Sequence, residues 1–98
     1  MSAPIYIGDE VSAAGFRIAG AHVTVPDDGA EAVALAEARA AAPLVLISAA
    51  VAARIPEHDM ATALAALAPL TLIVPDLSGK IPVPDVAARL RRQLGMEA

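Results

Sequence analysis

The sequence has no cysteine and no tryptophan, and its 98 residues include one tyrosine and one phenylalanine. Without cysteine the chain forms no disulfide framework and offers no thiolate to a metal ion. The shortage of aromatic rings leaves no platform on which bases could stack. Basic side chains are also few, 7 against 11 acidic ones, and the formal net charge is −4. We therefore expect no binding of nucleic acid, because no basic field gathers phosphates.

Long hydrophobic runs are missing as well. The longest bulky apolar stretches are residues 43–53 and 64–74, each about half of the ~20 residues that a membrane-spanning helix needs. The N-terminal segment reaches Asp9 and Glu10 without a basic region, which argues against a signal peptide. We expect a cytoplasmic chain without direct membrane insertion, folded as a single domain over residues 1–98.

Alanine supplies 25 of the residues, and short apolar runs alternate with helix-favouring segments. The predicted strands are 4–8, 21–25, 44–47 and 70–74. The predicted helices are 9–19, 31–42, 58–68 and 85–96, with a short helical turn over 48–54. Uniformly apolar strands separated by helices are typical of parallel sheets that are covered on both faces. The predicted fold class is therefore α/β, a three-layer, four-stranded and mainly parallel sheet with helices on both faces plus a C-terminal helix.

Single residues mark several predicted helix ends. Asp9 is placed to cap the first helix, and Gly20 to follow its last turn. Ser48 is placed to cap the short helical turn. In the helix over 58–68 we expect the bulky side chains to lie on one side; these are Met60, Leu64 and Leu67.

Charge divides the chain into two parts. Residues 1–76, the predicted α/β body, carry nine acidic and three basic side chains, whereas residues 77–98 carry four basic and two acidic ones. The second part comprises a proline-rich connector and a predicted amphipathic helix. An apolar side chain recurs there every four residues, at Val86, Leu90 and Leu94. This tail could fold against the acidic body or reach an acidic partner.

The acidic pair at Asp9 and Glu10 is the first candidate for chemistry, because ligands of parallel α/β sheets bind at the carboxyl ends of the strands. The pair resembles the Mg²⁺-binding carboxylates of response-regulator receivers, so a divergent receiver-like signalling domain is the alternative function. However, Ser48 stands where a receiver needs its phosphate-accepting aspartate, and the lysine of that site is missing. Helix capping by Asp9, with Glu10 near the helix dipole, is the favoured interpretation.

A small enzyme that uses Ser48 is a third hypothesis, and the sequence gives it little support. No GxSxG motif surrounds Ser48, and the two histidines, His22 and His58, lie in separate segments. Their spacing is not that of metal ligands, and no glycine-rich phosphate loop is present. We therefore expect no catalytic residue, no cofactor and no metal site.

Two motifs resemble the F subunit of V-type and archaeal-type rotary ATPases. The first is the turn Gly8-Asp9-Glu10 after the opening strand, and the second is Gly15-Phe16-Arg17-Ile18-Ala19-Gly20. The order of the following elements is similar too, up to a basic helix that ends in Leu94-Gly95. The helical turn after the third predicted strand carries Ala52-Ala53 where the family often has acidic residues. The resemblance extends over essentially the whole chain.

The resemblance implies a non-catalytic component of the central stalk, or rotor. Such a component binds the coiled-coil D subunit and helps to couple ATP turnover in the catalytic head to rotation and to transport of protons or sodium ions. It is peripheral to the membrane through the ATPase complex. The family's C-terminal segment contacts the rotor, so the expected partner-binding residues are Val86, Arg89, Leu90, Arg91, Arg92 and Leu94.

Overall fold

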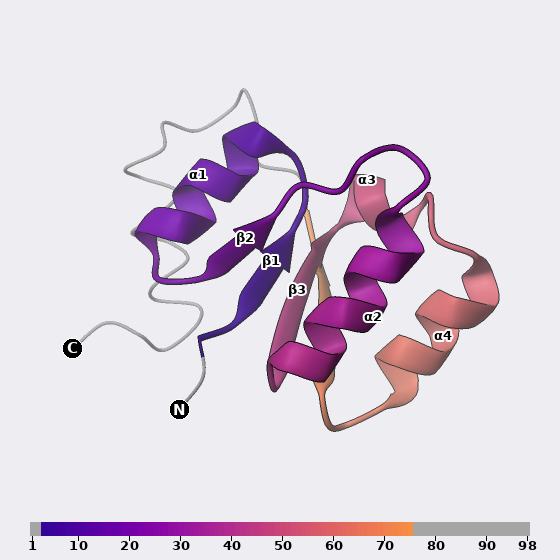
Figure 1. Cartoon of the computed structure of the whole chain (residues 1–98). Coiled ribbons are helices and arrows are strands. Elements are labelled where there is room, and N and C mark those ends of the chain that lie inside the picture. The colour runs from indigo at the N-terminus through magenta and orange to yellow at the C-terminus, as the bar shows by residue number, and fades with distance from the viewer. Residues whose placement is uncertain (1–2, 76–98) are drawn as a thin grey trace.

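The computed structural model describes residues 3–75, which form a sheet with helices on both sides (Figure 1). The strands are β1 (Ile5–Ile7), β2 (His22–Thr24), β3 (Leu44–Ser48) and β4 (Leu70–Val74). The helices are α1 (Glu10–Ile18), α2 (Glu31–Ala41), α3 (Ala49–Ala52) and α4 (Glu57–Ala65). All four predicted strands are confirmed. The helices predicted over 9–19 and 31–42 and the helical turn predicted over 48–54 are confirmed as well. The predicted helix over 85–96 and most of the connector before it lie outside the described residues.

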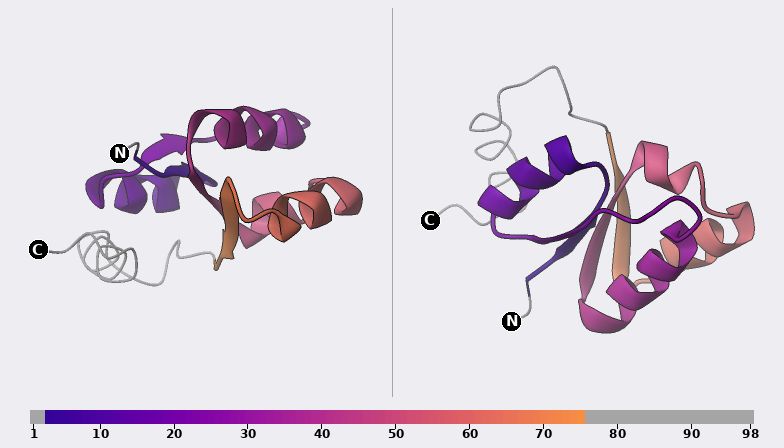
Figure 2. Two further views of the ribbon diagram at one scale, coloured as in Figure 1. Left: turned by 90° about the horizontal axis from the view of Figure 1, so that it is seen from below. Right: turned by 45° about the horizontal axis from the view of Figure 1, so that its top comes forward.

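The four strands are parallel and follow the order β2-β1-β3-β4. In this register Tyr6 of β1 lies between Val23 of β2 and Leu46 of β3. Figure 2 shows α1 on one face of the sheet and the helices α2, α3 and α4 on the other. The α/β prediction is confirmed, and β2 and β4 are the two edge strands.

The larger core lies between the sheet and the three helices α2, α3 and α4. Its buried members are Ile7, Leu35, Ala38, Val45, Ile47, Val51, Ile55, Met60 and Ala63. The two alanines among them let α2 and α4 approach the sheet closely. The uniformly apolar sequence of β3 follows from its place at the centre, since both of its faces are covered.

The smaller core lies on the opposite face, beneath α1. It consists of Tyr6, Ala13, Phe16, Ala19, Ala21 and Leu46. The rings of Tyr6 and Phe16 stack with their centroids 3.9 Å apart and their planes 8° from parallel. The only two aromatic residues of the chain therefore pack on each other, and both are fully buried.

The fourth helix ends earlier than predicted, and not all of its bulky side chains are buried. It ends at Ala65, and Ala66 is already extended, whereas the sequence predicted a helix to residue 68. Pro69 disfavours helical backbone at Ala68, so a helix that reaches residue 68 is unfavourable. Of the three bulky side chains predicted on one side, Met60 is buried, whereas Leu64 is 43% exposed and Leu67, beyond the helix end, is 90% exposed. The buried side chains are Met60 and Ala63, because the small alanine lets the helix lie close to the sheet.

Candidate functional site

The first sequence motif lies at the carboxyl ends of the strands, where it forms the start of α1. The N–H of Gly8 donates to the carbonyl of Thr24 at 3.1 Å, which ties the turn to β2. Asp9 is the N-cap of α1, and its carboxylate accepts hydrogen bonds from the N–H groups of Val11 and Ser12, each at 3.0 Å. Glu10 follows in the first turn, where a negative charge favours the helix dipole. The motif thus builds a helix terminus, as the favoured interpretation expected.

The electrostatics of Asp9 agree with this structural role. Burial by itself raises the pKa of Asp9, but the hydrogen bonds from Ser12 and Val11 outweigh it and hold the pKa below its ordinary value. Both backbone bonds go to the same oxygen, Oδ2. Among residues 3–75, no three His, Asp or Glu side chains gather as metal ligands would.

The glycines and the phenylalanine of the two motifs hold α1 on the sheet. A Cβ atom at Gly8 would collide with the hydroxyl of Tyr6, so this position needs glycine. Gly15 and Phe16 are both buried on the inner side of α1. Gly20 has a φ of 105°, a backbone conformation that residues with a Cβ rarely adopt. This conformation turns the chain from α1 toward β2. The motifs are therefore structural signatures of the strand–helix–strand unit.

Ser48 and the two histidines do not form a catalytic group. Ser48 is 1% exposed, and its Oγ accepts a hydrogen bond from the N–H of Val51 at 3.1 Å, which caps α3 as predicted. His22 is exposed on the edge strand β2, and His58 is exposed in the first turn of α4. Because its only polar side-chain atom is buried in a cap, Ser48 offers no accessible nucleophile.

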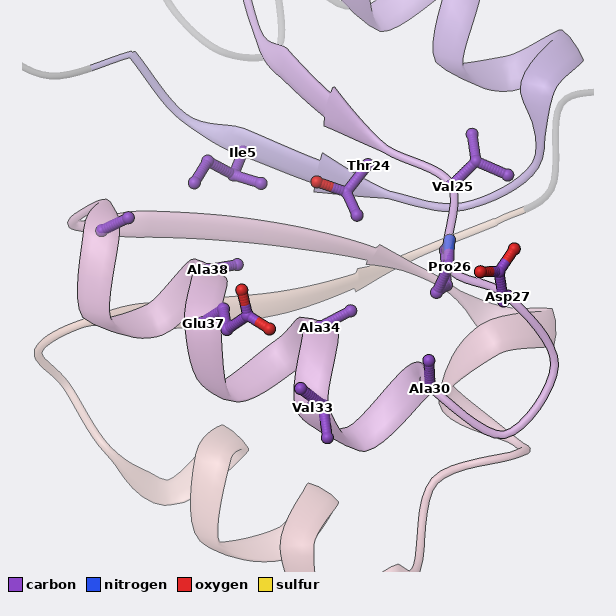
Figure 3. Close-up of a pocket in the computed structure, with 11 residues that line it drawn as sticks. Ile5, Thr24, Val25, Pro26, Asp27, Ala30, Val33, Ala34, Glu37 and Ala38 are labelled. Atoms are coloured by element: carbon purple, nitrogen blue, oxygen red, sulfur yellow. The ribbon is translucent and has the colours of Figure 1, made fainter.

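A groove lies between α2 and the β2 side of the sheet (Figure 3). Its volume is about 430 Å³. The groove is lined by Ile5, Thr24, Val25, Pro26, Asp27, Ala30, Val33, Ala34, Glu37, Ala38 and Ala41. In Figure 3, α2 presents alanine side chains toward the strands, and Thr24 extends from β2 into the same space.

Sequence reasoning missed this groove. The buried side of α2 carries Glu31, Leu35 and Ala38, which share one helical face. Val33 lies off that face and is 59% exposed. A single exposed apolar residue is ordinary on a protein surface, so Val33 by itself does not indicate the groove.

The predicted partner-binding residues, Val86, Arg89, Leu90, Arg91, Arg92 and Leu94, lie outside the described residues. Within residues 3–75, no helix is long and apolar enough to cross a membrane.

Comparison with known proteins identifies the family of the chain. The family model described as ATP synthase (F/14-kDa) subunit matches residues 5–91. This match includes both sequence motifs, the whole described sheet and most of the basic C-terminal segment. Searches of curated proteins and of solved structures found no significant match. The chain therefore belongs to the family of F/14-kDa subunits of V/A-type ATP synthases.

Proposed function

We propose that this chain is the non-catalytic F subunit in the central stalk of its ATPase, and that it binds the coiled-coil D subunit of the rotor. In that position it couples ATP turnover in the catalytic head to rotation and to transport of protons or sodium ions. The observation that carries the proposal is the family match over residues 5–91. In this proposal the chain lies on the cytoplasmic side of the membrane, to which it is attached only through the ATPase complex.

The use of the polar side chains at the carboxyl edge of the sheet supports a binding role over a catalytic one. Asp9 and Ser48 stand at the ends of neighbouring strands, where α/β enzymes place reactive groups. Both side chains are instead committed to backbone N–H groups at helix starts. A protein that works through contacts with its neighbours needs these residues only for its own fold.

The sequence of residues 77–98 supports a docking role for that segment. Val86, Leu90 and Leu94 are spaced as one face of a predicted helix, and arginines at 89 and 91 flank this face. We propose that the apolar stripe packs against the rotor coiled coil and that Arg89, Arg91 and Arg92 meet acidic groups beside it. Exposed ion pairs contribute only about 0.2–1 kcal/mol each, so the stripe supplies most of the affinity. In this proposal residues 1–76 are the body of a single domain and residues 77–98 are its docking segment.

The proposal is tested by titrating the purified full-length chain with its cognate D subunit and measuring the complex by size-exclusion chromatography and calorimetry. We expect a 1:1 complex and no ATP hydrolysis by the chain alone. Leu90→Asp places a charge in the stripe and should weaken the complex at least about tenfold, which is about 1.4 kcal/mol. Ala88→Asp, on the opposite side of the predicted helix, is the matched control.

Three outcomes are distinguishable. Loss of binding with Leu90→Asp and not with Ala88→Asp supports docking through the stripe. If neither substitution affects the complex, the proposed function stands and the proposed C-terminal contact is contradicted. A folded full-length chain that forms no complex with the coiled-coil partner contradicts the proposed function.

A further inference from the structure

The outer edge of β4 is open in the described part of the chain. Among the described strands β4 pairs with β3 alone, and Figure 2 shows it at one end of the sheet. None of its residues, Leu70-Thr71-Leu72-Ile73-Val74, is charged. Natural proteins usually protect an edge strand with charged side chains, because an open edge pairs readily with another strand. The strand β4 lacks this protection.

The backbone of β4 directs alternate residues to β3 and to the open edge. The N–H of Leu70 donates to the carbonyl of Pro43 at 2.9 Å, so the backbone of Leu70 faces β3. Along a strand every second residue directs its N–H and C=O to the same side, so Leu72 faces β3 as well. Thr71 and Ile73 therefore direct their N–H and C=O groups to the open edge, where a further strand can bond to them.

Bulky apolar side chains of β4 are exposed on both faces of the sheet. Leu46, the register partner of Leu72, belongs to the core beneath α1, so Leu72 and Leu70 face the α1 side. The helix α1 itself packs on β1 and β2. Leu72 is 44% exposed and Leu70 is 37% exposed, and Ile73 on the other face is 45% exposed. A strand added beside β4 would remove this apolar surface from water.

The open edge is symmetric about Leu72. Thr71 and Ile73 lie one residue on either side of it, and Pro69 and Pro75 lie three residues on either side. A two-fold axis at Leu72 therefore places Thr71 opposite Ile73 of a second copy, and each such pair exchanges both of its hydrogen bonds. Pro69 falls opposite Pro75 of the second copy, and the ladder ends there because proline has no N–H.

We propose that β4 is a self-association edge, through which two copies of this chain pair as antiparallel strands around a two-fold axis at Leu72. Leu72 then faces Leu72 of the second copy as a non-hydrogen-bonded pair, with Cα atoms about 4.5 Å apart. The other edge strand, β2, has three residues, of which His22 and Thr24 are exposed. Because the two edges differ, the symmetric contact closes as a dimer. This inference is independent of the proposed stalk function.

The size of the contact sets the strength that we expect. A pair of such short strands buries less than the roughly 1,200–2,000 Å² of a standard interface, so the dimer should be weak and form at high micromolar to millimolar concentration. Each copy has a net charge of −4, and the two copies therefore repel each other at long range. Added salt screens this repulsion and should strengthen the dimer.

The first test measures the association of the full-length chain by sedimentation over a range of concentrations. Leu72→Lys and Leu72→Glu each place like charges opposite each other across the axis, and each should weaken the dimer at least about tenfold. An equal mixture of these two variants should restore it, because opposite charges then face each other. Val33→Lys is the control on α2, at a 59% exposed position of a helix that packs on β1 and β3. Circular dichroism checks the fold of each variant.

The second test measures the register, and it uses the absence of cysteine from the chain. Leu72→Cys places a single thiol opposite its own copy, at a Cα separation that a disulfide allows. Leu70→Cys is the matched control on the same strand, because Leu70 falls opposite Val74 of the second copy. Under mild oxidation Leu72→Cys should form the covalent dimer at least about tenfold faster than Leu70→Cys.

The results separate the proposal from its alternatives. Restoration of the dimer in the mixture of Leu72→Lys and Leu72→Glu supports direct pairing at Leu72, since a merely destabilised strand would not be rescued. A wild-type chain that stays monomeric at millimolar concentration would overturn the proposal, whatever else covers the edge. A dimer that both charged variants retain, or equal crosslinking of the two cysteine variants, would overturn it too. If a charged variant fails to fold, the two cysteine variants decide.

Discussion

The ring of Tyr6 in β1 lies flat against the ring of Phe16 in α1, with centroids 3.9 Å apart. This pair joins the first strand to the first helix, and neither ring is exposed. In a chain with no other aromatic residue, the pair supplies the largest side chains of the core beneath α1. The second sequence motif thus contains the residue that fixes α1 on the sheet.

Replacement of Phe16 by leucine should destabilise the fold by about 1–3 kcal/mol. The substitution leaves part of the ring's volume empty and removes the stacking contact with Tyr6, which is itself worth about 0.5–1.5 kcal/mol. Urea denaturation followed by circular dichroism measures the change. Val11→Ala, at a 56% exposed position of the same helix, should alter the free energy of unfolding by less than about 0.5 kcal/mol. Equal effects of the two substitutions would contradict the role of the stack.

Replacement of Gly8 by alanine should cost about 1–3 kcal/mol, because the new Cβ collides with the buried Tyr6 side chain. The new Cβ meets the Tyr6 hydroxyl most closely and the ring carbons next, so a Tyr6→Phe background should relieve part of the cost. A double-mutant cycle from four urea denaturation curves measures this coupling. Additive effects would show that the Gly8 position is not limited by the Tyr6 hydroxyl.

Much of the fold could be predicted because its signals are local. The cap residues Asp9 and Ser48, and the glycine at 20, each act on the backbone within three residues of themselves. The strand over 70–74 was predicted with its observed bounds, since a run of bulky apolar residues is bounded there by two prolines. Local backbone chemistry of this kind is visible in a sequence.

The face of α4 and the groove beside α2 depend on distances between elements, which a sequence does not state. The spacing placed Leu64 on the same side of the helix as Met60, but Met60 and Ala63 are the side chains that join the core. Likewise, the groove exists because α2 lies over β1 and β3 and leaves β2 uncovered. Residue spacing along α2 is compatible with either position of the helix.

The cap at Asp9 should make part of the stability depend on pH. The pKa of Asp9 is lower in the folded chain than in the unfolded chain. The contribution of Asp9 to the free energy of unfolding is therefore complete above the ordinary carboxyl pKa, and it is lost as the pH falls through the lower pKa of the folded chain. Asp9→Ala should cost about 0.5–2 kcal/mol at pH 7. This cost should shrink at acidic pH, where the wild-type carboxylate also loses its charge.

Asp9→Asn is the control for the pH effect, because asparagine caps a helix without a titrating group. Its difference from Asp9→Ala should be nearly constant with pH. Urea denaturation of the three proteins at pH 7 and at about pH 3 gives the comparison. An Asp9→Ala cost that stays the same at both pH values would show that the charge of the cap is irrelevant.

The last prediction concerns Thr71 of β4, which is 2% exposed. Its hydroxyl has no hydrogen-bond partner among the described residues. A buried hydroxyl without a partner costs free energy, and valine has nearly the same shape and favours strands at least as well. Thr71→Val should therefore raise the free energy of unfolding by about 1 kcal/mol. Thermal denaturation of the variant should show a higher midpoint, whereas a lower midpoint would mean that the hydroxyl is satisfied in the folded protein.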